Sequence, residues 1–328
     1  MKKISIFLLI FALLCTYFCF SAFAETEIDT VLEYDIQEDN TAVITHYDSL
    51  ETKFVIPDEI DGHTVTAIGK KAFYECHRLS KVTIPDTVVT IENQAFEKCK
   101  ALSEVTLGSN VKSIGYRAFA DCKQLTAINF PDGLQTIGNN AFVRCQKLAS
   151  VLIPSSVTTI GNYAFSDCVN MSSATFSNGD LSIGECAFGW CLKLSEITLG
   201  SNTKSIGDHA FYACDGLAKV TIENPECAIF DDIETIPNNA TIYGCLTSSA
   251  QNYAKKYERK FVPLELGDVD MDSHITVLDA TTIQKYLASI VDLTDDQLIL
   301  GDADKDGVVT VIDATKIQQF VANMIDEF

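Results

Sequence analysis

The chain is poor in positive charge and in the motifs that many hydrolases use. Its 24 lysines and arginines face 45 aspartates and glutamates, and the net charge is −21. Such a surface repels nucleic acid and anionic lipid and attracts cations. The chain has neither a GxSxG nor an HExxH motif, and its histidines are scattered, at His46, His63, His77, His209 and His274. These absences argue against a nucleic-acid-binding protein and against the common serine and zinc hydrolases.

Long apolar runs are also scarce, and the one that exists lies at the start. Two lysines precede an apolar stretch from Ile4 to Phe20, and Ala22-Phe23-Ala24 follows it. This order is typical of a secretory signal peptide, so we expect residues 1–24 to be removed and the rest to be secreted rather than membrane-embedded. No other segment approaches the roughly 18 apolar residues of a membrane span. Because the segment holds two lysines and no acidic residue, its removal takes the net charge from −21 to −23.

What the middle of the chain does contain is a repeat. An FxxC motif recurs with a period of 23 residues and no insertion. Its phenylalanines are Phe73, Phe96, Phe119, Phe142, Phe165, Phe188 and Phe211, and its cysteines are Cys76, Cys99, Cys122, Cys145, Cys168, Cys191 and Cys214. This period falls in the range of leucine-rich repeats. One unit cannot bury its own apolar face, so stacked units must share a continuous core.

Within each unit, the constant positions indicate the core. A short alternating run such as Val82-Thr83-Ile84 suits a strand, and a glycine such as Gly115 or Gly161 indicates a tight bend. We expect the Ala-Phe pair, the cysteine and the leucine that follows to point inward. The variable positions should face solvent.

The cysteines allow more than one interpretation. Ten lie beyond residue 24, with no CxxC pair and no Cys/His cluster at zinc spacing. The seven periodic ones are best interpreted as small buried hydrophobes. Cys186 lies at a variable position, where we expect an exposed thiol. Cys227 and Cys245 could close a loop of about 18 residues with a disulfide or could remain thiols, and the sequence leaves both open.

Two stretches near the end repeat a metal-binding pattern. GDVDMDSHITVLDATTIQKYL begins at Gly267, and GDADKDGVVTVIDATKIQQFV begins at Gly301. Both place carboxylates at positions 1, 3, 5 and 12 of a 12-residue loop, as calcium loops of the EF-hand type do, with a backbone carbonyl at position 7 and often a water-mediated contact at position 9. The predicted ligands of two Ca²⁺ ions are therefore Asp268, Asp270, Asp272, His274, Thr276, Asp279, Asp302, Asp304, Asp306, Val308, Thr310 and Asp313.

The surroundings of the two loops differ from those of an EF-hand pair. Gly307 suits the sharp turn at position 6, whereas Ser273 replaces that glycine in the first loop. Apolar residues at helical spacing follow each loop, for example Ile283 and Tyr286 after the first. We expect a helix after each loop and no helix in front of either one.

The repeat region resembles the BspA-type leucine-rich repeats of bacterial surface and secreted proteins, over residues 31–264. We expect an N-terminal lead-in or cap at 25–67, repeats at 68–222 and a C-terminal cap at 223–264, because the end rungs of a solenoid need covering. The loop–helix duplicate closely resembles a type I dockerin, over residues 267–328. The expected fold class is an α+β repeat solenoid, leucine-rich-repeat and BspA-like, followed by a small all-α calcium-binding dockerin module.

The dockerin resemblance implies a partner, namely a cohesin module of a scaffoldin in a cellulosome-type assembly. It also implies an extracellular protein that is associated with the cell surface through the scaffoldin. In that family, positions 10, 11, 17 and 18 of each copy carry partner choice. Here these are Val277, Leu278, Gln284, Lys285, Val311, Ile312, Gln318 and Gln319.

Dockerins usually accompany glycoside hydrolases, so an enzyme is a serious alternative. The segments assigned above take up residues 25–328 and leave no stretch for the paired carboxylates of a glycosidase. We therefore expect a non-catalytic protein with no catalytic residues. The BspA-type resemblance implies a protein or cell-surface ligand for the solenoid, as in adhesion. The alternatives are a carbohydrate-binding solenoid that uses Trp190 and Tyr212, or an unrecognised polysaccharide-degrading enzyme.

Overall fold

The computed structural model describes residues 4–7, 31–245, 248–264, 266–270, 272, 274–326 and 328. Apart from residues 4–7, the expected signal segment lies outside the described residues, and so does Ser273. The chain divides into two compact units, the first made of Met1–Val220 and Cys227–Ala240, the second of Thr221–Glu226 and Thr241–Phe328.

The first unit begins with strands that pair in both directions. β1 (Ile4–Phe7), β2 (Val31–Ile36) and β3 (Ala42–Asp48) are antiparallel neighbours. β3 pairs in parallel with β6 (His63–Ile68), and β5 (Glu59–Ile60) pairs with β6 in the antiparallel direction. The N-terminal strands thus lead directly into the repeating part of the sheet.

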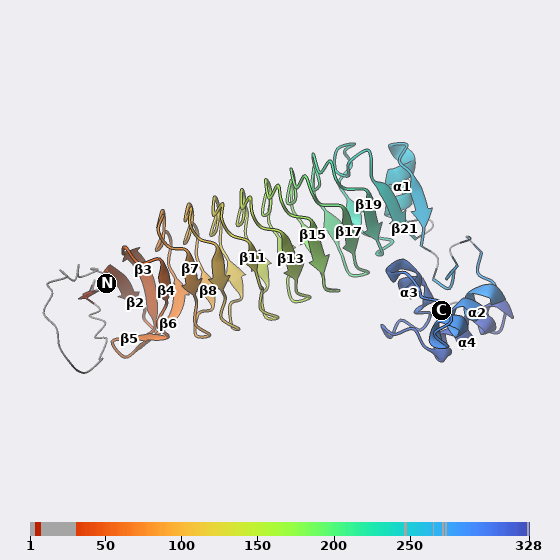
Figure 1. Ribbon diagram of the computed structural model, residues 1–328, viewed down its shortest axis with the longest axis horizontal. Helices are drawn as coiled ribbons and strands as arrows, with labels where there is room; N and C mark the ends of the chain where they lie inside the picture. The colour runs from red at the N-terminus through yellow and green to blue at the C-terminus, as the bar shows by residue number, and fades with distance from the viewer. Residues whose placement is uncertain are drawn as a thin grey trace, which may run out of the picture. The chain divides into compact units, whose positions relative to one another are not determined.

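From β6 onward, each rung adds one two-residue strand to this sheet (Figure 1). The added strands are parallel, and residues 23 apart stand side by side, as Ile114 and Ile137 do. The isoleucine of each pair lies toward the core, because side chains alternate between the two faces of a strand. These strands are β8 (Thr90–Ile91), β10 (Ser113–Ile114), β12 (Thr136–Ile137), β14 (Thr159–Ile160), β16 (Ser182–Ile183), β18 (Ser205–Ile206) and β20 (Ala228–Ile229).

A second set of parallel strands comes from the alternating runs that the sequence indicated. Its members are again related by the repeat, as Val82 and Val105 are. This confirms the strand predicted at each alternating run, whereas the two-residue strands of the other sheet were not predicted. The strands are β4 (Lys53–Val55), β7 (Lys81–Thr83), β9 (Glu104–Thr106), β11 (Ala127–Ile128), β13 (Ser150–Ile153), β15 (Ser173–Phe176), β17 (Glu196–Leu199) and β19 (Lys219–Ile222).

The FxxC segments form no strand, yet they also bond from rung to rung. The residues two before and two after each phenylalanine have positive φ, as at Lys71 (62°) and Glu75 (60°), and none of these fourteen residues is a glycine. Alternating backbone handedness points alternate N–H groups in one direction. Phe73 N donates to Ala95 O at 2.7 Å, and Glu75 N donates to Glu97 O at 2.9 Å. We call these segments the turn strip.

The rung glycines correct the expectation of a bend that needs glycine. Positive φ among the described glycines occurs at Gly62, Gly267 and Gly307, not in the rungs. A Cβ on Gly161 would instead lie 2.5 Å from Asn139 N of the preceding rung, closer than any real Cβ contact. Glycine is required there because successive rungs approach too closely for a side chain.

The core columns follow the prediction. The seven repeat phenylalanines are completely buried, and neighbouring rings lie 4.7–5.9 Å apart, as Phe73–Phe96 and Phe188–Phe211 illustrate. Six of the seven periodic cysteines are completely buried, and Cys76 is half-buried. The thiols of the six buried cysteines each donate to a phenylalanine carbonyl, as Cys99 Sγ does to Phe73 O at 3.0 Å, whereas Cys76 Sγ donates to Tyr47 O at 3.5 Å.

The expectation of an exposed thiol at Cys186 is wrong. Its side chain is only 6% exposed, and the side chain of Tyr163 from the preceding rung lies beside it. Cys227 and Cys245, both within the described residues, are thiols rather than a disulfide. Cys245 Sγ donates to Glu223 O at 3.5 Å.

Among its described residues, the second unit contains a small parallel pair of strands and four helices. β21 (Thr241–Gly244) pairs with β22 (Phe261–Pro263), and α1 (Ser249–Lys256) connects them. Ser248 caps α1 by accepting a hydrogen bond from Gln251 N at 3.2 Å. The buried Tyr253 and its neighbours Ala250 and Ala254 form the inner face of α1.

The duplicate at the end folds into a loop and helix, twice. α2 (Val277–Leu287) follows the first loop, and α4 (Val311–Val321) follows the second. The expectation that no helix precedes a loop is wrong for the second copy, because α3 (Asp295–Gly301) ends directly before Asp302. Thr294 and Gln297 form a capping box at its start, an N-terminal signal that is visible in the sequence.

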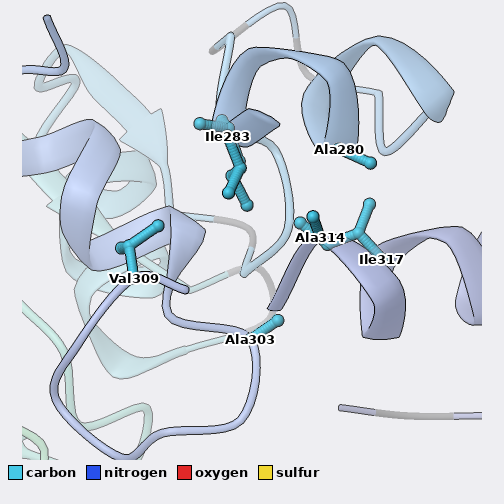
Figure 2. Close-up of a cluster of buried hydrophobic side chains, with 7 residues drawn as sticks. Ala280, Ile283, Ala303, Val309, Ala314 and Ile317 are labelled. Atoms are coloured by element: carbon cyan, nitrogen blue, oxygen red, sulfur yellow. The ribbon is translucent and has the colours of Figure 1, made fainter. Parts of the chain in front are cut away.

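α2 and α4 share a small core. Its completely or almost completely buried members are alanines, valines and isoleucines from both copies: Val269, Ala280, Ile283, Ala303, Val309, Ala314 and Ile317. Figure 2 shows Ala280 on α2 opposite Ala314 and Ile317 on α4. Small side chains at the contact allow the two helices to pack closely. A core of this size supplies little hydrophobic free energy by itself.

Candidate functional site

The two acidic loops have the same internal hydrogen bonds. In the first, Asp268 Oδ1 accepts from Asp272 N at 3.1 Å, and in the second, Asp302 Oδ1 accepts from Asp306 N at 3.0 Å. The aspartates at position 3 also correspond. Asp270 Oδ1 accepts a hydrogen bond from Asp272 N at 3.2 Å, and Asp304 Oδ1 accepts one from Asp306 N at 3.1 Å. The loops therefore curl in the same way and turn their carboxylates inward.

Carboxylate oxygens gather in both loops. Ligand atoms of Asp268, Asp270 and Asp279 lie within 4.8 Å of one another. In the second loop the corresponding group is Asp302, Asp304 and Asp306. Positions 1 and 3 thus meet in both copies, joined by position 12 in the first and by position 5 in the second.

Position 12 is the most buried carboxylate of each loop. Asp279 and Asp313 are completely buried. Asp279 Oδ1 accepts from Val269 N at 2.7 Å and from Asp270 N at 3.0 Å, while its Oδ2 accepts from Thr276 N at 2.7 Å. These bonds hold the aspartate in place from both ends of the loop.

The clustered carboxylates repel one another in the absence of a cation. Burial raises the pKa of Asp270, and the neighbouring Asp279 carboxylate raises it further. Burial likewise raises the pKa of Asp304, with Asp313 and Asp306 adding to the effect. The donors are hard oxygens in a 12-residue loop, so the residues present fit Ca²⁺.

The threonines at position 9 have a role that the sequence analysis missed. Thr276 Oγ1 accepts from Leu278 N at 3.0 Å, and Thr310 Oγ1 accepts from Ile312 N at 3.1 Å. Each forms a capping box with the aspartate three residues later. The T-x-x-D pattern could have revealed it. One aspartate therefore serves both the loop and the start of the helix.

Gly307 has φ of +90° at position 6 of the second loop, the left-handed conformation that glycine adopts most easily. A Cβ there would meet nothing within 4 Å, so only the backbone conformation calls for glycine. The corresponding Ser273 lies outside the described residues.

Beside the loops, both helices expose the same apolar pair. The exposed fractions are 55% for Val277, 59% for Leu278, 61% for Val311 and 55% for Ile312. All four side chains lie on the surface of the module and are not part of its buried core. Gln284, Lys285 and Gln318 are also exposed, whereas Gln319 is half-buried.

Comparison with known families identifies both parts of the chain. Residues 66–181 and 158–240 match the BspA type leucine rich repeat region, in six copies, over more than half of the chain. The chain belongs to the BspA-type leucine-rich-repeat family. Residues 266–322 match the dockerin type I domain. This chain is thus a BspA-type solenoid with a C-terminal type I dockerin, a kind of module that typically binds calcium and a cohesin.

Solved structures similar to the BspA-type chain include leucine-rich-repeat proteins. A T. pallidum leucine rich repeat protein is 25% identical, with 70% of this chain and 94% of that chain covered and a TM-score of 0.49. A leucine rich cell surface protein from Faecalibacterium prausnitzii is 20% identical, with 75% and 96% covered and a TM-score of 0.33. The pneumococcal vaccine antigen PcpA is 16% identical, with 74% and 98% covered and a TM-score of 0.36. None of the curated proteins matches the chain.

Both matched families are non-catalytic kinds of domain. Proteins with BspA-type repeats or dockerins are typically extracellular or located at the cell surface. Among the described residues, no helix combines the length and the apolar character that crossing a membrane requires.

The solenoid residues singled out in the sequence lie together on the turn strip. The rings of Trp190 and Tyr212 are 5.0 Å apart and meet edge to face at 77°. Both side chains are half-buried, and Trp190 N donates to Tyr212 O at 2.8 Å. The two rings therefore support each other and do not form one flat platform.

Proposed function

We propose that this BspA-type chain is a non-catalytic, secreted component of a cellulosome-type assembly. Its dockerin binds a scaffoldin cohesin when two Ca²⁺ ions are bound, and its solenoid binds a protein or cell-surface ligand in a setting of polysaccharide degradation. The observation that carries the proposal is the exposed apolar pair at the start of α2 and α4, each directly after a carboxylate loop.

The two ions would be held by the twelve predicted loop residues. The aspartates supply carboxylate oxygens, and His274 and Val308 supply backbone carbonyls at position 7. Because the hydroxyls of Thr276 and Thr310 cap the helices, we expect position 9 to contribute through water. Bound calcium would neutralise the carboxylates and stabilise the fold of the module. An ordered loop would in turn fix the start of the helix that follows it and the position of the apolar pair that this helix exposes.

The exposed faces of the two helices are close copies. α2 presents Val277, Leu278, Gln284 and Lys285, and α4 presents Val311, Ile312, Gln318 and Gln319. A rotation of about 180° would exchange the two sets. We therefore propose two cohesin-bound orientations, in which either helix dominates the contact.

Calorimetry of the full chain against a panel of cohesins, with calcium and with chelator, tests the proposal. We expect tight binding that chelator abolishes. Val277→Ala with Leu278→Ala, or Val311→Ala with Ile312→Ala, should leave binding largely intact, because the other face substitutes. All four changes together should abolish it.

Leu152→Ala is the matched control, since Leu152 is a 59% exposed apolar residue of the solenoid. It should leave cohesin binding unchanged. Failure of the calcium-loaded chain to bind any cohesin would contradict the docking function. A complete loss of binding from one pair alone would contradict the two orientations.

For the solenoid, the geometry favours a protein ligand over a glycan. The edge-to-face arrangement of Trp190 and Tyr212 offers no extended ring face for a sugar to stack on. Binding of the full chain to insoluble polysaccharides, with and without Trp190→Ala, tests this. Retention that depends on Trp190 would reverse the preference.

A further inference from the structure

The last regular rung carries a cluster of side chains that the other rungs do not. The turn-strip position two before each repeat phenylalanine is occupied in turn by Lys71, Gln94, Arg117, Asn140, Tyr163, Cys186 and His209. At Arg117 and Tyr163 a carboxylate of a neighbouring rung lies close to this position, that of Glu97 and that of Glu185 respectively. At His209 the segment one repeat further along the chain supplies two carboxylates, those of Asp232 and Glu234.

Both ring nitrogens of His209 face carboxylates. Nδ1 lies 2.5 Å from Asp208 Oδ1. On the other side, Nε2 lies 3.3 Å from Glu234 Oε2 and 3.8 Å from Asp232 Oδ1. Ligand atoms of Asp208, His209 and Asp232 all lie within 4.8 Å of one another.

This arrangement has the form of a metal-binding histidine rather than of a plain acidic cluster. Metal-bound histidines usually donate their other N–H to a carboxylate, which fixes the tautomer. Asp208 takes that place at Nδ1, while Nε2 faces Asp232 and Glu234, where a bound ion would replace the ring proton that otherwise hydrogen-bonds to Glu234. Two ligands of a tetrahedral ion, each about 2.1 Å from the metal, are about 3.4 Å apart. The separations of 3.3 and 3.8 Å bracket this value, and the longer one exceeds a hydrogen bond.

The backbone holds these groups in place. Glu234 N donates to Asp232 Oδ1 at 2.8 Å, so the two acids belong to one tight turn. Phe211 N donates to Thr235 O at 3.2 Å and ties that turn to the rung of His209. The side chains of His209, Asp208, Asp232 and Glu234 are 29%, 35%, 38% and 56% exposed, so an ion can enter from solvent.

We propose that His209 Nε2, Asp232 and Glu234 bind a divalent transition-metal ion of the zinc class, with Asp208 as the positioning residue on Nδ1. The imidazole nitrogen selects such an ion over calcium, which prefers oxygen ligands. Three carboxylates around one imidazole also leave a net negative charge that a dication neutralises. The ion links the last rung to the turn that follows it.

Cobalt titration of the full chain tests the site, with calcium in excess to occupy the dockerin loops. Visible absorption reports nitrogen and oxygen coordination of Co²⁺, and Zn²⁺ should displace it. We expect one Co²⁺ per chain outside the loops. His209→Ala should abolish this band, and Asp232→Asn or Glu234→Gln should weaken binding at least tenfold.

Asp208→Asn tests the positioning role, with an expected loss of about 10–100-fold in affinity and an altered absorption band. His77→Ala is the control, because His77 is an exposed histidine whose Nδ1 lies 3.1 Å from a backbone carbonyl, that of Lys98. It should bind Co²⁺ as the unaltered chain does. Circular dichroism checks that each variant is folded, and Glu234→Gln, at a half-exposed side chain, provides a test that does not alter the rung. Absence of the band in the unaltered chain, its persistence in the folded His209→Ala variant, or an unchanged Co²⁺ affinity of the Glu234→Gln variant overturns the proposal.

Discussion

The rungs of the solenoid and the two copies of the dockerin both repeat a sequence unit, but they bury different kinds of group. Each rung buries a phenylalanine and places it against the next, with ring centroids about 5 Å apart. Each dockerin copy buries an aspartate, Asp279 or Asp313, that hydrogen-bonds to its own loop. The solenoid is therefore stabilised by apolar contact between neighbours, whereas the dockerin depends on charge compensation. The two should respond to different perturbations.

Removal of calcium should have the largest effect, because it should lower the stability of the dockerin and not that of the solenoid. Calorimetric unfolding of the full chain should show two transitions, and chelator should abolish the one that belongs to the dockerin, because folding and metal binding are coupled. The solenoid transition should stay where it is. If chelator changed neither unfolding transition, the dockerin would not depend on bound calcium in the way that we infer.

Removal of a stacked ring should destabilise the solenoid and leave the dockerin unchanged. Phe142→Ala removes a completely buried ring that lies 5.2 Å from Phe119 and from Phe165, and we expect a loss of about 3–5 kcal/mol. Urea unfolding of the solenoid measures this, while calcium affinity should be unchanged. Leu152→Ala, at a 59% exposed side chain, should lose less than about 0.5 kcal/mol.

The close approach of rungs can be tested at a glycine. Gly161→Ala places a Cβ 2.5 Å from Asn139 N and should lower the unfolding free energy of the solenoid by about 1–3 kcal/mol, as overpacking does. Gly133→Ala is the matched control, since its nearest neighbour would be 3.9 Å away. Equal effects of the two changes in the same urea experiment would show that inter-rung spacing is not what requires glycine.

The smallest expected effect concerns the helix caps of the dockerin. Thr310→Ala removes the hydroxyl that accepts from Ile312 N and should lower stability by about 1 kcal/mol. Calcium affinity should fall as well, because Asp313 loses a partner. Thr315→Ala, whose hydroxyl donates to Val311 O within the helix, should change both quantities less. Thermal unfolding and calcium titration of both variants provide the comparison.

The sequence alone was sufficient for the features that depend on spacing along the chain. A 23-residue period predicts a stacked core because a position that recurs in every unit must face its own copies. Carboxylates at alternate positions predict a calcium loop for a similarly local reason. Both families and the buried phenylalanine and cysteine columns were accessible in this way.

Features that need contacts between distant residues were not accessible. Cys186 is buried beside Tyr163 of the preceding rung. α3 is a different case, because its capping box is a local signal in the sequence that was overlooked. The left-handed turn strip also escaped detection, because side chains such as Lys71 and Glu75 rarely adopt positive φ and do so here through bonds to the next rung.

The sequence by itself thus determined which residues repeat, which groups are buried in each repeat and which residues can hold calcium, since all three follow from local chemistry and period. Only the tertiary structure decided how the rungs bond through their turns, why their glycines are required and that His209 meets Asp232 and Glu234. The physical reason is that these properties depend on distances between chain segments about one repeat apart. Stacking, rather than local preference, sets those distances.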